Sequence, residues 1–147
     1  MCEYFDIHFD EIHLIKELWE RNRQYHEDHS EKFGFQYQGL CFEDRVQRFS
    51  GLSEENLKIT VAKEQGNCVG YCISSIFDSK GELESIHVNA STRGKGIGKE
   101  LAQQHIDWMR ENNCKAIGVT VLHENESTIR FYESMGFFKN TLYMQMD

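Results

Sequence analysis

The feature that most constrains this chain is a glycine-rich turn between a strand pattern and a helix pattern. Residues 82–89 alternate polar and apolar side chains as a half-buried strand does, and residues 94–112 repeat apolar side chains at helical spacing. Gly94, Gly96 and Gly98 alternate where the two patterns meet. Glycine has no Cβ and adopts backbone conformations that other residues avoid. The chain must therefore pass from a sheet into a helix through a turn with little side-chain cover, which is typical of α/β proteins.

The same turn predicts a binding site for an anion. The first four N–H groups of a helix have no partner within the helix, and the helix dipole places about half a positive charge there. Arg93, Lys95 and Lys99 add cations to an otherwise acidic chain. Helix starts of this kind bind phosphate groups. We therefore expect the ligand to carry a phosphate or a pyrophosphate.

The spacing of the glycines excludes two common nucleotide sites. A triphosphate-binding loop needs four residues between its first glycine and a Gly-Lys-Ser/Thr run, whereas only three residues separate Gly94 from Gly98, and Glu100 follows Lys99. The dinucleotide fingerprint places two residues before its third glycine, whereas the glycines here alternate strictly. A turn without any ligand stays open as an alternative, although each glycine at a helix start weakens the helix.

The remaining patterns predict one α/β domain over residues 1–147 with a mixed sheet. Strands are expected over residues 4–9, 57–64, 68–77, 82–89, 115–122 and 137–146, and helices up to about residue 28 and over 42–49, 94–112 and 125–135. The strands at 57–64, 68–77 and 82–89 follow one another through short turns and form an antiparallel meander. The segment 115–122 is rich enough in apolar residues to be buried on both faces.

Charge and cysteine content exclude several classes of function. With 24 acidic and 16 basic side chains the net charge is −8, which disfavours binding to nucleic acid and to anionic membranes. No apolar stretch approaches the roughly 20 residues of a membrane span, and the N-terminus is acidic where a signal peptide is basic. Five scattered cysteines without a CxxC pair indicate reduced thiols in the cytoplasm. No metal site is expected, because His26 and His29 lack a third ligand at suitable spacing.

Two motifs resemble those of the GNAT superfamily of N-acetyltransferases. The first is Arg93-Gly94-Lys95-Gly96-Ile97-Gly98 after a strand that ends in Val88, and the second runs from Asn125 through Phe131-Tyr132-Glu133 to Gly136-Phe137. Ala90 departs from the proline that many members carry. The resemblance implies a central mixed, mostly antiparallel sheet of six to seven strands, flanked by about four helices and splayed between the fourth and fifth strands.

The resemblance also implies an activity. An enzyme of this family moves an acetyl group from acetyl-CoA, the co-substrate, to a primary amine of a small molecule or a protein by direct attack in a ternary complex. Two alternatives stay open: a non-catalytic acyl-CoA sensor or protein-interaction module on the same fold, and an acyltransferase for longer chains. The acceptor and the oligomeric state are not specified, although a homodimer is the commonest soluble assembly.

Proton transfer is the central requirement of this chemistry. An alkylamine has a pKa near 10.4 and must lose a proton before it attacks, so a carboxylate facing the cofactor is needed. Period-two alternation would place Glu82, Glu84, Ile86 and Val88 on one face of the strand. The resemblance selects Glu84 as the base, and Glu82 stays as the alternative. Solvent-exposed acids with no such role are also common on strands.

The remaining site residues follow from the resemblance. Tyr132 would offer a proton to the departing sulfur, although it could instead be a core aromatic, and the Val88 N–H would bind the thioester carbonyl. Asn125 would bond the pantetheine arm, cap a helix, or do both. The expected cofactor-binding residues are Ile86, His87, Val88, Arg93, Gly94, Lys95, Gly96, Ile97, Gly98, Lys99, Asn125 and Ser127.

The acceptor side is less clearly marked in the sequence. An aromatic cluster with acids near it forms either core or an amine-binding groove; its members are Phe33, Phe35, Tyr37 and Phe42, with Glu27, Asp28, Glu31, Glu43 and Asp44. The net negative charge suits a cationic acceptor such as a polyamine, an aminoglycoside or a lysine side chain.

Overall fold

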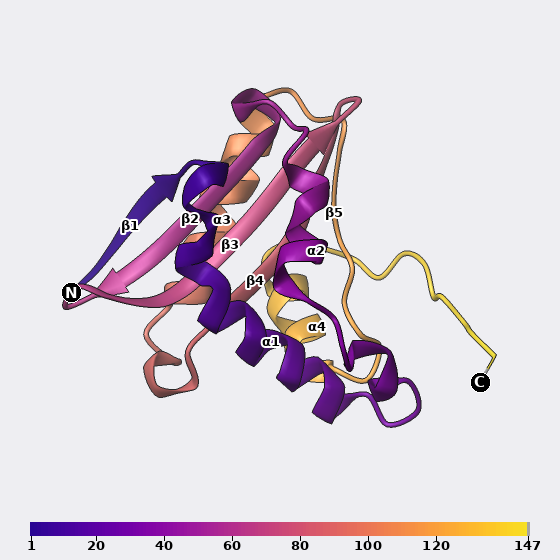
Figure 1. Ribbon diagram of the computed structural model, residues 1–147. Helices are drawn as coiled ribbons and strands as arrows, with labels where there is room; N and C mark the ends of the chain where they lie inside the picture. Colours follow the sequence, from indigo (N-terminus) through magenta and orange to yellow (C-terminus); the bar gives the residue numbers. More distant parts are fainter. Residues whose placement is uncertain (147) are drawn as a thin grey trace.

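The computed structural model describes residues 1–146 and contains one five-stranded sheet with the strands in sequence order (Figure 1). The strands are β1 (Cys2–Ile7), β2 (Leu57–Glu64), β3 (Asn67–Phe77), β4 (Lys80–Val88) and β5 (Ala116–Val119). The first four pair antiparallel and β5 pairs parallel to β4. Four α-helices flank the sheet, which confirms the predicted mixed, mostly antiparallel α+β architecture.

One face of the sheet is covered by α1 (Lys16–His29) and the short α2 (Phe42–Val46). A 3-10 helix over Phe9–Ile15 leads into α1, and another over Gln47–Phe49 continues α2. The core on this face joins apolar side chains of these helices to those of β2 and β3 at alternate positions, including Trp19, Phe42, Ile59, Val61, Tyr71 and Ile73. The apolar residues at helical spacing in the N-terminal third of the chain pack against this face of the sheet.

The opposite face is covered by α3 (Ile97–Glu111) and α4 (Glu126–Ser134). Its core consists of the alternate positions of β2 and β3 together with β4 and the two helices, including Ala62, Val69, Cys72, Leu83, Leu101, Met109 and Tyr132. At Gly81 a Cβ atom would collide with the side chain of Met109. That glycine therefore lets α3 pack closely on β4.

A bulge in β4 overturns the period-two prediction for its acids. Ile73 of β3 pairs with Ser85 and Ser74 pairs with Leu83, so Glu84 has no partner in the register. A bulged residue shifts the alternation of a strand by one. Glu84 consequently contacts groups on the α1–α2 face, whereas Ile86 packs in the core on the α3–α4 face. The expectation that Glu82, Glu84, Ile86 and Val88 share one face was therefore wrong.

The sheet is splayed between β4 and β5, as predicted. The two strands pair only from Lys80 opposite Ala116 to Leu83 opposite Val119. Beyond Leu83, β4 continues to Val88 with no strand at that edge among the described residues. The second half of β4 therefore presents backbone groups to an opening between the strands.

The predicted number of strands was wrong. The sheet has five strands instead of six to seven, because residues 137–146 form no strand and run away from the body after α4 (Figure 1). Their apolar side chains are exposed: Phe138, Leu142, Tyr143, Met144 and Met146. A strand pattern forms a ladder only when a neighbouring strand supplies the hydrogen-bond partners, and no described segment does so here.

The β5 prediction was also partly wrong. The segment expected over 115–122 is a strand only at Ala116–Val119. Its residues are exposed or half-buried rather than buried on both faces. The reason is its place at the edge of the sheet, where β4 is the only partner strand.

Candidate active site

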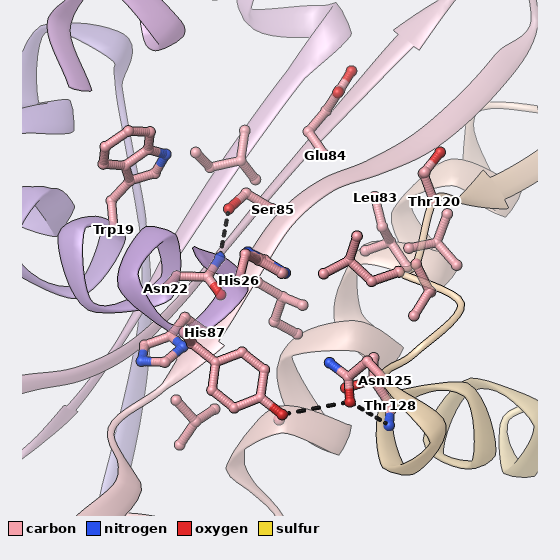
Figure 2. Close-up of a pocket in the computed structure, with 18 of the residues that line it drawn as sticks. Trp19, Asn22, His26, Leu83, Glu84, Ser85, His87, Thr120, Asn125 and Thr128 are labelled. Atoms are coloured by element: carbon pink, nitrogen blue, oxygen red, sulfur yellow. Dashed lines mark hydrogen bonds between the residues drawn. The ribbon is translucent and has the colours of Figure 1, made fainter. Parts of the chain in front are cut away.

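A cavity of about 550 Å³ occupies the opening between β4 and β5. Its walls come from β4, the N-terminal end of α3, the start of α4, α1 and α2. Figure 2 shows the side chains that α1, β4 and the start of α4 contribute. All of the predicted site residues but one line it: Glu84, Ile86, His87, Val88, Arg93, Gly94, Gly96, Ile97, Gly98, Lys99, Asn125, Ser127 and Tyr132. The exception is Lys95, and the alternative base Glu82 also lies outside the lining. The structure thus gathers two distant motifs around one space.

The glycine-rich turn has the backbone that its sequence predicts. Gly94 and Gly96 have φ of +87° and +79°, a left-handed conformation that side-chain-bearing residues rarely adopt. Gly96 is the N-cap of α3, whose unpaired N–H groups follow it. Gly98 has no such conformation, and a Cβ there would lie 3.6 Å from Cγ2 of Val88. The first two glycines are needed for the turn itself, whereas the third keeps space open beside β4.

The cations of the turn point in different directions. Arg93 donates from Nε to the Val88 carbonyl at 3.2 Å, and its guanidinium lies 5.8 Å from the ring centroid of Tyr25 in α1. The Lys95 ammonium instead pairs with Glu64 at the end of β2, 3.0 Å away. Among the predicted cations, Arg93 and Lys99 therefore face the cavity and Lys95 supports the turn from outside.

The N–H of Val88 points into the opening. Successive N–H groups of a strand point to opposite edges. The next residue, Asn89, donates its N–H to the Val69 carbonyl in β3 at 2.7 Å. The Val88 N–H consequently points away from β3, toward the side where β5 has diverged. A donor in this position is free to stabilise negative charge on a bound carbonyl oxygen.

Glu84 is the only carboxylate among the residues that line the cavity. One of its oxygens accepts a hydrogen bond from the Ser75 hydroxyl at 2.5 Å, and the other pairs with Arg48 at 2.7 Å. The Glu84 side chain is only 13% exposed, while that of Arg48 is 54% exposed. The bulge in β4 thus directs a largely buried carboxylate to the α1–α2 side of the cavity. Its partner there is Arg48, a cation on a long and more exposed side chain.

Tyr132 lies in α4, buried against the rings of Phe131 and Phe137 at centroid distances of 5.0 and 5.5 Å. It packs in the core on the α3–α4 face and also lines the cavity, so the core and catalytic interpretations are compatible. Burial raises the pKa of Tyr132 above its ordinary value. The phenol therefore stays protonated at neutral pH and is able to donate a hydrogen bond.

Asn125 is the N-cap of α4. Its side-chain oxygen accepts hydrogen bonds from the Thr128 N–H at 3.3 Å, the Ser127 hydroxyl at 3.2 Å and the Tyr25 hydroxyl at 3.4 Å (Figure 2). Capping is therefore one of its roles. Its amide nitrogen donates to no group in residues 1–146 and is available to a ligand in the cavity.

Residues of α1 form a wall of the cavity that the sequence did not single out. Asn22 donates to Ser85 of β4 at 3.5 Å (Figure 2). Asn22 also donates to the Tyr71 hydroxyl at 3.4 Å, and the Tyr71 and Ser85 hydroxyls are 2.7 Å apart. Asn22 and His26 are four residues apart on α1, a helix rich in charged residues. That spacing is a weak signal, because only the fold shows which face of α1 meets β4.

Two histidines that line the cavity, His87 of β4 and His26 of α1, are held in the neutral form. Burial, with Arg93, His26 and Arg21 nearby, lowers the pKa of His87 to about 4. Burial also lowers the pKa of His26, which stacks on Tyr37 at 5.5 Å between ring centroids. Neutral imidazoles add hydrogen-bonding capacity to the cavity without adding charge at neutral pH.

In residues 1–146, no three His, Cys, Asp or Glu side chains gather closely enough to hold a metal ion. Over the same residues, every helix is too short or too polar to cross a bilayer.

Comparison with known proteins identifies relatives of this site. Residues 14–137 match the family model described as the Acetyltransferase (GNAT) family. N-alpha-acetyltransferase 30 of Saccharomyces cerevisiae is 33% identical over 60 residues, which are 41% of this chain and 34% of that protein. Glucosamine 6-phosphate N-acetyltransferase of Trypanosoma brucei brucei is 31% identical over 67 residues, 46% of this chain and 44% of that protein. The chain thus spans less than half the length of these relatives.

Solved structures share the fold along the whole chain. A tetramutant of the BH1408 protein from Bacillus halodurans superposes with a TM-score of 0.77 at 19% identity and covers 99% of both chains. An aminoglycoside N-acetyltransferase AAC(6')-Iy solved in complex with CoA superposes with a TM-score of 0.68 at 15% identity, again over 99% of both chains. At these identities the likeness is one of fold.

Proposed function

Because the chain belongs to the acetyltransferase (GNAT) family, we propose that it moves an acetyl group from acetyl-CoA to a primary amine of a small molecule or a protein. The amine attacks the acetyl carbonyl directly, with both substrates bound in one ternary complex. The relatives named above act on different acceptors by their names, so those names support an amine acceptor as a class and no particular acceptor.

The observation that carries this proposal is the opening between β4 and β5 with the glycine turn at its mouth. A diphosphate fits the left-handed turn at Gly94 and Gly96, because bare N–H groups of α3 and the cations Arg93 and Lys99 converge there. The Asn125 amide and the Val88 N–H lie further along the same opening, where a pantetheine arm and a thioester would extend. The residues present therefore fit acetyl-CoA as a substrate.

Each of three residues of the chain has a separate role in the reaction. The carbon–nitrogen bond forms as the carbon–sulfur bond breaks; Glu84 takes the proton of the attacking amine, and Tyr132 offers its phenolic proton to the departing sulfur. The Val88 N–H binds the carbonyl oxygen on which charge develops. Glu82 is a weaker candidate for the base, because it lies outside the lining of the cavity.

An assay of acetyl-CoA-dependent thiol release over a panel of amines tests this function. We expect release of free CoA that depends on an amine and yields an acetylated product by mass spectrometry. Binding of CoA without any amine-dependent release would instead identify a sensor or interaction module. A faster reaction with a longer acyl-CoA would assign the enzyme to longer chains.

We further propose that residues 1–147 work as one domain in the cytoplasm and as a homodimer. The five cysteines are all free, which supports a reducing compartment. The exposed apolar segment 137–146 and the open edge of β5 support pairing with a second copy. Neither nucleic acid nor membrane is proposed as a partner, because the net charge is −8. Light scattering on the full chain and on a chain ending at Phe137, which keeps the ring that packs on Tyr132, tests the dimer. We expect the full chain to be a dimer and the shortened chain to be a monomer.

A further inference from the structure

We propose that the acceptor is an amine that also carries an oxyanion, a carboxylate or a phosphate, which Arg45 and Arg48 bind while the amine reaches Glu84. This inference rests on the proposed acetyltransferase function and names the class of its second substrate. It departs from the expectation of a cationic acceptor, which came from the net charge of the whole chain.

The charge of the cavity is opposite to that of the protein. The chain has a net charge of −8, yet the charged residues that line the cavity are five cations and one carboxylate. They are Arg23, Arg45, Arg48, Arg93, Lys99 and Glu84. A polyamine with several cationic groups would meet like charges at close range, which disfavours binding. The local charge therefore favours an acceptor with negative charge.

These cations fall into three groups. Arg93 and Lys99 stand at the glycine turn and belong to the cofactor end of the cavity. Arg23 is already neutralised, because it pairs with Glu27 at 2.7 Å and with Glu20 at 3.4 Å. Arg45 and Arg48 remain on the acceptor side, three residues apart on the wall formed by α2 and the following 3-10 helix.

The two remaining arginines are available to a ligand in different ways. Arg45 makes no ion pair within residues 1–146. Burial raises the pKa of Tyr37, another lining residue, and the positive charge of Arg45 opposes this rise only in part. Arg48 pairs with Glu84 through an exposed side chain. A guanidinium binds carboxylate and phosphate oxygens through two parallel hydrogen bonds, which suits this pair of side chains.

The acidic residues that would favour a cationic acceptor lie outside the cavity, and three of them bind other side chains. Glu43 pairs with Lys16 at 2.6 Å, Asp28 accepts from Gln24 at 2.8 Å, and Glu27 pairs with Arg23. None of them lines the cavity, nor do Glu31 and Asp44. Of the aromatic cluster expected to line an acceptor groove, only Tyr37 does so. Of the two alternatives for this cluster, core or amine-binding groove, the lining of the cavity therefore does not support the groove.

The arrangement of Glu84 and the arginines fits a substrate with both charges. An oxyanion that binds Arg45 and draws Arg48 away from Glu84 leaves the carboxylate free to accept the proton of the neighbouring amine. An amine without an oxyanion has to compete with Arg48 for the same carboxylate. We therefore expect acceptors with an oxyanion near the amine to react faster.

Matched acceptors that differ only in the anion test the inference. We would compare glucosamine with glucosamine 6-phosphate, and an amino acid with its amide, by acetyl-CoA-dependent thiol release. The prediction is a kcat/KM at least about 10-fold higher for the anionic member of one pair, and the pair that responds distinguishes phosphate from carboxylate. Equal or faster acetylation of the members without an oxyanion would overturn the inference while leaving the acetyltransferase function intact. No acetylation of any amine would overturn the function itself.

Variants of Arg45 test whether this residue binds the oxyanion. Arg45 is exposed, so Arg45→Gln should fold. We expect it to raise the KM for the acceptor with an oxyanion about 10-fold, to affect the KM for the acceptor without one much less, and to be partly rescued in Arg45→Lys. Arg110→Gln, at the far end of α3, is the matched control and should change neither KM. A wild-type KM for the anionic acceptor in Arg45→Gln would contradict the proposed role of Arg45.

Discussion

Arg48 holds the carboxylate of Glu84 at 2.7 Å, and this ion pair joins the helical layer of α2 to the bulge of β4. The bulge has a functional consequence, because regular alternation would have placed Glu84 and Ser85 on opposite faces of the strand. With the bulge, Glu84 and Ser85 both make polar contacts on the α1–α2 side of the sheet. The base candidate thereby lies on the α1–α2 side of the sheet rather than on the α3–α4 side.

Glu84→Gln should remove the base and preserve the fold. The amide keeps the size of the side chain and a hydrogen bond from Ser75, whereas it does not accept the amine proton. We expect kcat/KM to fall about 100-fold or more, with CoA affinity unchanged in a calorimetric titration. Glu82→Gln, outside the cavity, is the control and should keep the wild-type rate. The opposite pattern in the two variants would move the base to Glu82.

Tyr132→Phe should slow the release of CoA without loosening the core. Burial raises the pKa of Tyr132, so its phenol is a poor acid that assists the sulfur mainly as a hydrogen-bond donor. We expect kcat to fall about 10-fold, with unfolding temperature near wild type, in a thiol-release assay and a thermal melt. Tyr143→Phe in the exposed C-terminal segment serves as the control. A wild-type kcat in Tyr132→Phe would leave that residue with a packing role only.

The glycines of the turn should respond differently to alanine. Gly96→Ala puts a Cβ on a backbone with φ of +79°, which should lower the free energy of unfolding by about 1–2 kcal/mol. Gly98→Ala meets no such strain, and its methyl group would stand 3.6 Å from Val88 at the cavity wall. We expect Gly98→Ala to melt at or above the wild-type temperature and to bind CoA about 10-fold more weakly. Unchanged CoA affinity in Gly98→Ala would place the diphosphate elsewhere.

Acid should destabilise the protein through His105. This residue of α3 is fully buried, with Nδ1 2.7 Å from the Ser74 hydroxyl and Nε2 2.8 Å from the Thr60 hydroxyl. Thr60 donates its proton to Asp6, so it accepts from Nε2–H, which assigns the proton of the neutral ring to Nε2. Burial lowers the pKa of His105 to about 3.

The sign of this effect follows from proton binding. The unfolded chain binds a proton at His105 below a pH of about 6.5, whereas the folded chain does so only near pH 3, so stability falls as the pH is lowered through this window. We expect His105 to contribute a loss of about 2 kcal/mol between pH 7 and pH 5, measured by urea unfolding, and His87, whose pKa is also lowered, to add to it. His105→Gln should therefore reduce this dependence, and the exposed control His13→Gln should not. An equal slope in His105→Gln and wild type would assign the loss to other groups.

Local sequence signals predicted the parts of the fold that local physics determines. The turn at Gly94 and Gly96 has the left-handed backbone that makes glycine necessary, and the splay after Leu83 follows the expected order of elements. The bulge at Glu84 was missed, because an extra residue in a strand leaves the apolar pattern of the neighbouring positions almost unchanged. The strand predicted over residues 137–146 does not form, for a related reason. These residues have the pattern of a strand, but pairing depends on a partner that the pattern does not specify.

In the candidate site, too, the sequence predicted the local features but not those that depend on contacts between distant residues. Both motifs line the cavity, because each sits at the start of a helix whose position follows from the chain order. The direction of Lys95 toward Glu64 depends on a contact between residues 31 positions apart, which spacing within the motif does not indicate. The polar wall of Asn22 and the cation Arg45 were missed because their importance arises only when α1 and α2 pack against β4. Net charge did not indicate the excess of cations among the lining residues, because it averages over a surface that the cavity does not share.

The central claim is that the opening between β4 and β5 binds acetyl-CoA by its diphosphate at the start of α3, and calorimetric titration of the wild-type chain tests it most directly. We predict saturable one-to-one binding of CoA, and binding of pantetheine, which lacks the diphosphate, that is weaker by about 100-fold or more. Equal affinities for the two ligands, or no heat and no rise in melting temperature at millimolar CoA with folded protein, would contradict the claim.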